Sequence, residues 1–156
     1  LPRRGTVVTE LSAQEVAEIF EIREALFATV MERIIERCDP AFLAALRAGV
    51  ARLVELAPRP DAAGVYAETV YRLLIVTSRQ SDNLRLRRML RALSLQTLRY
   101  SKLGLASPER RARSAQLWQQ SLAAVENGDL AVGLQLLRQR IRESAAEAAR
   151  QLQVRP

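Results

Sequence analysis

The chain has 156 residues, of which 49% are hydrophobic, and it carries a net charge of +7 with no histidine. This length and apolar content predict one domain with a sizeable core, while the lack of histidine excludes histidine general bases, Cys/His nucleophile pairs and histidine-ligated metals. No apolar run approaches the roughly 18 residues of a membrane span, and the first five residues lack the apolar core of a signal peptide. Because Cys38 is the only cysteine, an internal disulfide is excluded, and the sequence predicts a soluble cytoplasmic protein.

The positive charge comes almost entirely from arginine, since Lys102 is the only lysine among 24 basic residues. A basic chain can indicate an anionic partner such as nucleic acid. Heavy use of arginine and alanine can also reflect genome composition, so nucleic-acid binding by this segment alone is only a minor hypothesis.

The first predicted helix follows a short extended stub. Residues 1–8, LPRRGTVV, have the turn and β-branched residues of a strand end. Ser12 and Glu15 then form the pattern of a capping box, which predicts a helix start. The apolar positions of this helix recur as far as Ile35, and Arg23 occupies one position within that stripe. An arginine at a core-facing position either snorkels to the surface or faces a polar cavity.

The third predicted helix is the most apolar. Asp39 and Pro40 cap the second helix, which ends near residues 58–60. The third runs from residue 61 or 62 to 78, and its segment 65–76, VYAETVYRLLIV, carries charge only at Glu68 and Arg72. A helix without a polar face has to be buried on nearly all sides, so we expect this pair, four residues apart, inside the protein.

Three further helices complete the predicted fold. One follows the turn at residues 78–83 and reaches Tyr100, the next is capped by Ser107 and contains Trp118, and the last follows the junction at residues 127–129. The short connections predict an all-α antiparallel bundle of about six helices, with a short extended stub at the N-terminus.

The charged pair has two interpretations. Desolvation costs several kcal/mol for each ion, so Glu68 and Arg72 could form a buried salt bridge that neighbouring helices complete. Alternatively, Arg72 lines a polar cavity with Arg23, and with Arg140 as a further candidate, where planar guanidinium groups bind an anionic ligand. Trp118 either fills the core or stacks on that ligand.

The sequence contains no enzyme motif. GxGxxG, a P-loop, GxSxG and CxxC are all missing from it. Glu68 beside Arg72 would stay ionised rather than act as an acid of raised pKa. We therefore expect a protein that is not an enzyme.

Four segments together resemble a known family of regulators. Residues 3–16 resemble a last wing strand followed by the linker into a first effector helix. Residues 21–30 resemble an R-x-x-L-E stretch, with Arg23 and Leu26 matching and Phe27 where Glu is usual. Residues 67–86 resemble a D-x-x-F-H helix that is followed by a turn ending in Asn. Residues 117–141 resemble an H-x-x-x-x-x-A-x-x-x-G-D helix pair. In this order and spacing, the segments resemble the FCD effector domain of GntR-family transcription regulators of the FadR type.

The resemblance implies an effector-binding and dimerisation domain. Residues 1–10 would be the remnant of a wing strand and linker from a DNA-binding domain missing from this chain, and residues 11–156 the helical domain. The implied assembly is a homodimer that contacts DNA only through the missing domain, and the implied ligand changes the placement of the two winged helices.

The resemblance also locates a candidate site. Many family members bind a divalent metal at four positions that are matched here to Glu68, Arg72, Trp118 and Arg140. Because two of the four are cationic, we expect neither a metal nor another cofactor. We expect instead that arginines hold a small acidic metabolite, at a site of Arg23, Glu68, Arg72, Trp118 and Arg140. The alternatives are a structural or interaction module whose pocket is closed by a Glu68-centred network, or a pocket for a more apolar, acyl-type ligand.

Overall fold

The computed structural model describes residues 10–153, and seven α-helices account for most of them. These helices are α1 (Ala13–Arg37), α2 (Pro40–Leu56), α3 (Ala63–Ser78), α4 (Leu84–Gln96), α5 (Leu98–Gly104), α6 (Pro108–Glu126) and α7 (Leu130–Gln153). Residues 10–153 contain no strand, which confirms the all-α prediction. The predicted extended stub falls on residues 1–9, outside the part that the structure describes.

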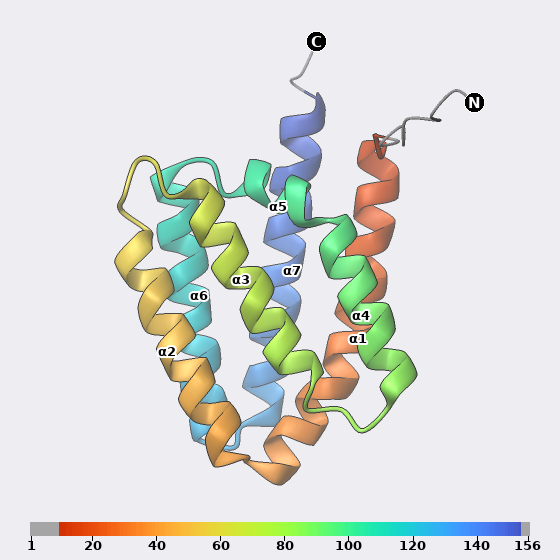
Figure 1. Cartoon of the computed structure of the whole chain (residues 1–156), viewed down its shortest axis with the longest axis vertical. Helices are drawn as coiled ribbons and strands as arrows, with labels where there is room; N and C mark the ends of the chain where they lie inside the picture. Colours follow the sequence, from red (N-terminus) through yellow and green to blue (C-terminus); the bar gives the residue numbers. More distant parts are fainter. Residues whose placement is uncertain (1–9, 154–156) are drawn as a thin grey trace, which may run out of the picture.

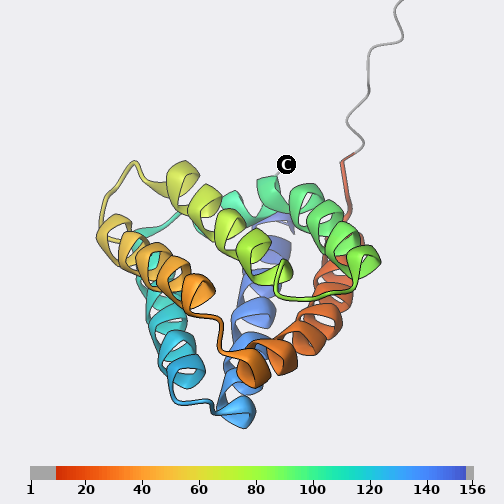
Figure 2. The same ribbon diagram turned by 60° about the horizontal axis from the view of Figure 1, so that its bottom comes forward.

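Six of the helices form a closed ring. Each packs against the next in the order α1, α7, α6, α2, α3, α4 and back to α1, as the two ribbon views show (Figures 1 and 2). The short helix α5 packs against α3, α4 and α7 at the end of the ring from which the C-terminal end of α7 emerges. The space inside the ring is therefore enclosed by side chains from many helices.

The predicted helix starts are confirmed by their caps. Ser12 and Glu15 form the complete capping box of α1, and the Asp39 side chain accepts a hydrogen bond from the Ala41 N–H at the start of α2. Ser107 caps α6 in the same way. These caps join residues that are only two or three positions apart, so the sequence alone is enough to predict them.

The predicted fourth helix is in fact two helices. α4 ends at Gln96, and α5 begins at Leu98, with Thr97 between them. The Thr97 hydroxyl donates to the Leu93 carbonyl at 2.9 Å and accepts a hydrogen bond from buried Arg23 of α1. A polar side chain that bonds to the backbone competes with the helical pattern, which accounts for seven helices where about six were expected.

The prediction that α3 is buried on nearly all sides is wrong. Val65 is 42% exposed, and Glu68 and Arg72 are exposed as well. The Glu68 carboxylate lies 3.7 Å from the Lys102 ammonium of α5 at the surface. Because α3 is one member of a ring, it has an outer face that is exposed. This outer face also carries apolar residues such as Val65, so the sequence pattern does not show which face of the helix points inward.

The contact between α2 and α3 depends on a glycine. A Cβ atom at Gly49 would clash with Cδ2 of Leu73, a buried residue of α3. We expect Gly49→Ala to lower the free energy of unfolding by about 1–2 kcal/mol, because overpacking forces side chains and backbone apart. Urea denaturation would measure this. Gly64→Ala is the control, since nothing lies within 4 Å of a Cβ there; equal losses in both variants would contradict the packing argument.

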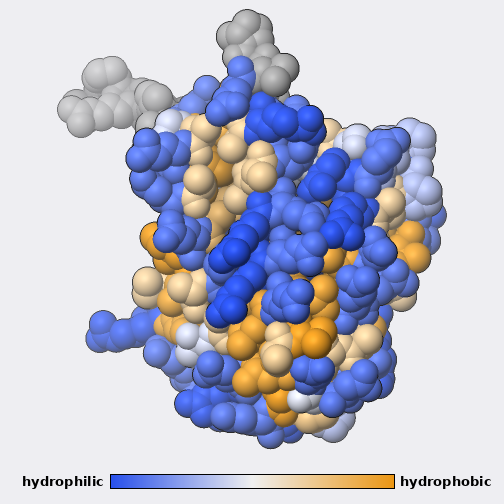
Figure 3. All heavy atoms as spheres, turned by 180° about the vertical axis from the view of Figure 1, so that it is seen from behind, coloured by the Kyte–Doolittle hydropathy of each residue, from blue (hydrophilic) through white to orange (hydrophobic). Residues whose placement is uncertain are grey.

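The outer surface is mainly polar. Seen from behind, the molecule presents a broad hydrophilic area with apolar patches in its lower half (Figure 3). Glu24 of α1 binds Arg142 of α7 at 3.0 Å and lies 3.7 Å from Arg138, so ion pairs join these two neighbouring helices. None of the described helices combines the length and apolar character needed to cross a membrane.

Candidate functional site

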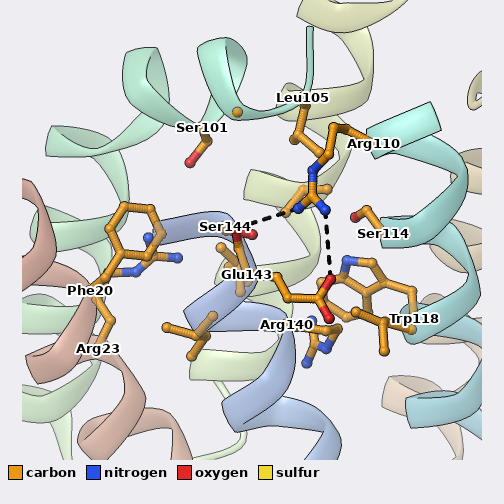
Figure 4. A pocket seen from close by; sticks show the side chains of 15 residues that line it. Phe20, Arg23, Ser101, Leu105, Arg110, Ser114, Trp118, Arg140, Glu143 and Ser144 are labelled. Atoms are coloured by element: carbon orange, nitrogen blue, oxygen red, sulfur yellow. Dashed lines mark hydrogen bonds and ion pairs between the residues drawn. The ribbon is translucent and has the colours of Figure 1, made fainter. Parts of the chain in front are cut away.

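A cavity of about 50 Å³ lies inside the ring at the α5 end. Side chains of α1, α3, α5, α6 and α7 line it, among them Arg23, Leu74, Trp118 and Arg140. A buried water needs roughly 10–15 Å³ of such space, so the cavity holds on the order of four waters or a small metabolite. Figure 4 shows Arg23 and Arg140 on different sides of it.

Arg23 is a buried cation without a carboxylate partner among the described residues. It is 3% exposed, and its Nη1 donates to the Thr97 hydroxyl at 2.9 Å. Its guanidinium carbon lies 4.9 Å from the centre of the Phe20 ring, and its buried Nε has no hydrogen-bond partner in the part of the chain that the structure describes. Burial lowers the pKa of Arg23 to about 10. The positive charge of Arg23 is therefore buried at a cost in free energy, and its Nε–H group has no acceptor among the described residues.

Arg140 has fewer hydrogen-bond partners than Arg23 among the described residues. Its guanidinium lies over the Trp118 ring, 3.6 Å from the centroid, a cation–π contact. The Nε is buried without a hydrogen-bond partner, and within residues 10–153 no salt bridge involves Arg140. Burial lowers its pKa to about 9, with an opposing effect of Tyr66 and a further lowering by the positive charge of Arg23. Trp118 covers one face of the guanidinium and leaves its in-plane N–H groups for an acceptor.

Glu143 is the only described carboxylate that lines the cavity, and it is already bound. Arg113 donates to both of its oxygens, at 3.0 and 3.2 Å, and Gln139 donates at 3.0 Å. The Arg110 guanidinium lies 3.7 Å from the same carboxylate (Figure 4). These contacts, that of Arg113 first, lower the pKa of Glu143. Glu143 therefore leaves the charges of Arg23 and Arg140 uncompensated.

The remaining polar lining consists of hydroxyl groups. Ser101 of α5, Ser114 of α6 and Ser144 of α7 border the cavity from three helices. The sequence analysis missed all three, and no local signal could have found them, because each lies in a stretch where serine is an ordinary surface residue.

The structure corrects the site on α3. Glu68 and Arg72 do not line the cavity: Arg72 borders an open surface groove between α3 and α4, together with Arg79, Arg87, Arg88 and Arg91. The α3 residues that line the cavity are Val70 and Leu74. They are also four residues apart, two positions further along the helix than the resemblance placed the pair. A closed network centred on Glu68 is excluded, because that side chain lies outside the ring.

The lining does not fit a divalent metal. The four positions that face one another across the cavity carry Val70, Leu74, Trp118 and Arg140, none of which is a usual metal ligand. Residues 10–153 contain no group of three or more His, Cys, Asp or Glu side chains that could hold an ion. The positive charge of this cavity comes from the guanidinium groups of its arginines.

A second, smaller cavity lies next to the first. It has a volume of about 20 Å³, and it shares Leu74, Trp118 and Arg140 with the first cavity. Its other lining residues are mostly apolar and include Phe27 and Leu137. The Trp118 and Arg140 pair thus separates a polar space near α5 from an apolar space further into the ring.

Arg111 shows how this fold satisfies a buried arginine. It is 0% exposed, and its guanidinium donates to the carbonyls of Ala57, Arg59, Leu105 and Ala106. These carbonyls follow the ends of α2 and α5, where helix dipoles place partial negative charge. Arg111 is therefore structural, and the sequence analysis did not single it out.

A family model described as the FCD domain matches residues 18–143. This range covers most of the chain and includes Arg23, Trp118 and Arg140. Comparison with curated proteins and comparison with solved structures give no match.

Proposed function

The chain belongs to the FCD domain family, the C-terminal effector domain of GntR-family transcription regulators, and we propose that its central cavity binds a small acidic metabolite through Arg23 and Arg140. The observation that carries this proposal is a pair of guanidinium groups, from buried Arg23 and half-buried Arg140, whose buried Nε atoms have no hydrogen-bond partner among residues 10–153. A buried charge without a partner costs several kcal/mol. An anion in the cavity offsets that cost and supplies the missing acceptors.

Carboxylate chemistry suits the geometry of Arg140. A guanidinium binds a carboxylate through two parallel N–H groups in its own plane. The Trp118 ring covers the face of the Arg140 guanidinium and fixes that plane. The cavity serines add neutral hydroxyl groups that can bind further polar atoms of the ligand.

An acyl-type ligand finds less support. The apolar cavity beyond Trp118 has a volume of only about 20 Å³, which is on the order of one or two water-sized positions. This space suits a methyl or ethyl group rather than a long chain.

Arg23 offers a route from the ligand to the outer helices. It connects α1 to Thr97, the residue at the break between α4 and α5. Three residues further on, the Tyr100 hydroxyl accepts a hydrogen bond from the Leu11 N–H at 2.8 Å, directly before α1. We propose that an anion on Arg23 alters these contacts and thereby the arrangement of a dimeric regulator, which requires tighter binding to one arrangement than to the other.

Small acids are expected to stabilise the domain against heat. A thermal-shift series with short carboxylic acids at neutral pH measures this, since a ligand that binds only the folded state raises the melting temperature with its concentration. Arg140→Met is expected to abolish the response.

Arg72→Met is the matched control, because it removes the same charge from the surface groove and should leave the response unchanged. If no acid shifts the melting temperature, or if both variants respond like the unaltered chain, the proposal fails.

A further inference from the structure

We infer that the surface groove between α3 and α4 is a binding site for an oligophosphate, a ligand in which several phosphate groups lie close together. This site is separate from the central cavity and does not depend on the function proposed for that cavity. The two helices are neighbours in the ring (Figure 1), and the groove has a volume of about 660 Å³. Small-molecule sites typically have volumes of roughly 300–1,000 Å³, so the groove has room for a compact ligand.

Arginines line both walls of the groove. Arg72 of α3 and Arg79 at the end of that helix contribute from one side, and Arg87, Arg88 and Arg91 of α4 contribute from the other. None of the described residues that line the groove is acidic. The dipoles of the C-terminus of α3 and the N-terminus of α4 oppose each other at the turn between these helices. The positive charge of the groove therefore comes from its side chains.

The acidic residues of this part of the chain have other partners. Residues 69–108 contain eight basic residues and one acidic residue, Asp82. Arg37 of α1 donates hydrogen bonds to both carboxylate oxygens of Asp82, and Glu68 of α3 lies 3.7 Å from Lys102 of α5. Within the described part of the chain, none of the five groove arginines forms a salt bridge.

Arginines on other helices are instead paired with carboxylates. Arg47 of α2 binds Glu126 at 2.6 Å, and Arg142 of α7 binds Glu24 at 3.0 Å. The high arginine content of the sequence does not by itself explain why the groove collects arginines without acids. Like charges that are held close together repel one another. A polyanion in the groove removes that repulsion, and its binding is favoured for this reason.

Phosphate groups suit the groove better than a single carboxylate does. A guanidinium donates two parallel hydrogen bonds to the oxygens of a phosphate, and a terminal phosphate carries a charge of about −1.5 to −2 at neutral pH. Two or three linked phosphates therefore match five arginines in charge and in number of acceptors. Ile75, Val76 and Leu84 also line the groove. These apolar side chains reduce the water around the arginines, which strengthens the attraction.

Calorimetric titration of the unaltered chain with tripolyphosphate tests the inference. A salt concentration of about 0.15 M limits long-range attraction to the basic surface. We expect tripolyphosphate to bind with a Kd below about 100 μM. Citrate has three carboxylates and fewer charges, and we expect it to bind at least about tenfold more weakly. A Kd for tripolyphosphate above that limit, or equal affinity for citrate, would overturn the inference.

Variants locate the ligand in the groove. Arg88→Gln and Arg91→Gln are each expected to lower the affinity at least about threefold, and together at least about tenfold, because charge-assisted hydrogen bonds are lost. Arg85→Gln is the matched control, since Arg85 is an exposed arginine of α4 that does not line the groove. It should change the affinity by less than about twofold. Equal losses in Arg85→Gln and Arg88→Gln would indicate general charge attraction and would overturn the site.

Two further measurements separate the groove from other anion sites. Arg140→Met is expected to bind tripolyphosphate like the unaltered chain, because Arg140 lines the central cavity; loss of binding in this variant would overturn the assignment to the groove. A DNA duplex presents its phosphates along a rigid cylinder, so few of them can enter a groove between two helices. Displacement of tripolyphosphate by duplex DNA at equal phosphate concentration would identify a nucleic-acid surface and overturn the inference.

Discussion

Arg111→Met is expected to lower the free energy of unfolding by about 3–5 kcal/mol, because several carbonyls lose their donor at once and each buried acceptor left unsatisfied costs about 1–3 kcal/mol. The guanidinium of Arg111 is the donor to four carbonyls at the ends of α2 and α5. Methionine keeps much of the volume but has no donor, so buried carbonyls lose their partners. Denaturation in guanidinium chloride, followed by circular dichroism, measures the loss.

Two further variants separate charge from geometry at Arg111. Arg111→Lys keeps the charge, but a single ammonium group cannot reach all four carbonyls as a planar fork does, so most of the loss should remain. Arg72→Met removes an exposed arginine and should change the stability by less than about 0.5 kcal/mol. A loss below about 1 kcal/mol in Arg111→Met would show that these hydrogen bonds do not hold the two helix ends.

Arg140→Met is expected to act in the opposite direction and to raise the free energy of unfolding, without ligand, by about 1–3 kcal/mol. Methionine of similar size fits beside Trp118 and Leu74 and removes a charge whose pKa burial lowers to about 9. The lost cation–π contact costs roughly 2 kcal/mol when it is desolvated, less than the several kcal/mol of desolvation that the charge itself costs. The same denaturation experiment measures the gain.

The stability of Arg140→Met also tests the role of the cavity. A gain in stability together with loss of the response to acids is the expected exchange at a ligand site, where a group is kept for binding at a cost to the fold. If Arg140→Met loses several kcal/mol, as expected for Arg111→Met, Arg140 is a structural residue and the main support for an anion site disappears.

Several features of the site could be predicted from single positions. Arg23 interrupts an apolar stripe, and the structure indeed places it inside the ring, 3% exposed. Trp118 and Arg140 are candidates from the helix patterns that the family resemblance also assigns to the site, and they do line one cavity with Arg23. Their roles as ligand-binding residues remain predictions, whereas their convergence is an observation.

The face of α3 could not be predicted from its sequence. Segment 65–76 has apolar residues on both faces, so its periodicity does not say which face points inward. The ring places Val70 and Leu74 at the cavity and leaves Glu68 and Arg72 exposed. A shift of two residues on a helix is a rotation of about 200°, which moves a residue from one face to the other.

The sequence by itself determined the helices and most of their starts, because capping boxes, Asx caps and the Gly128 turn act between residues two to four positions apart. Only the tertiary structure decided what the buried arginines do. The break at Thr97 involves a hydrogen bond from Arg23, which is 74 positions away in the sequence. Arg111 donates hydrogen bonds to carbonyls at the ends of two helices, up to 54 positions away. Whether a buried guanidinium finds such acceptors or remains open to a ligand depends on which helix ends the closed ring brings beside it.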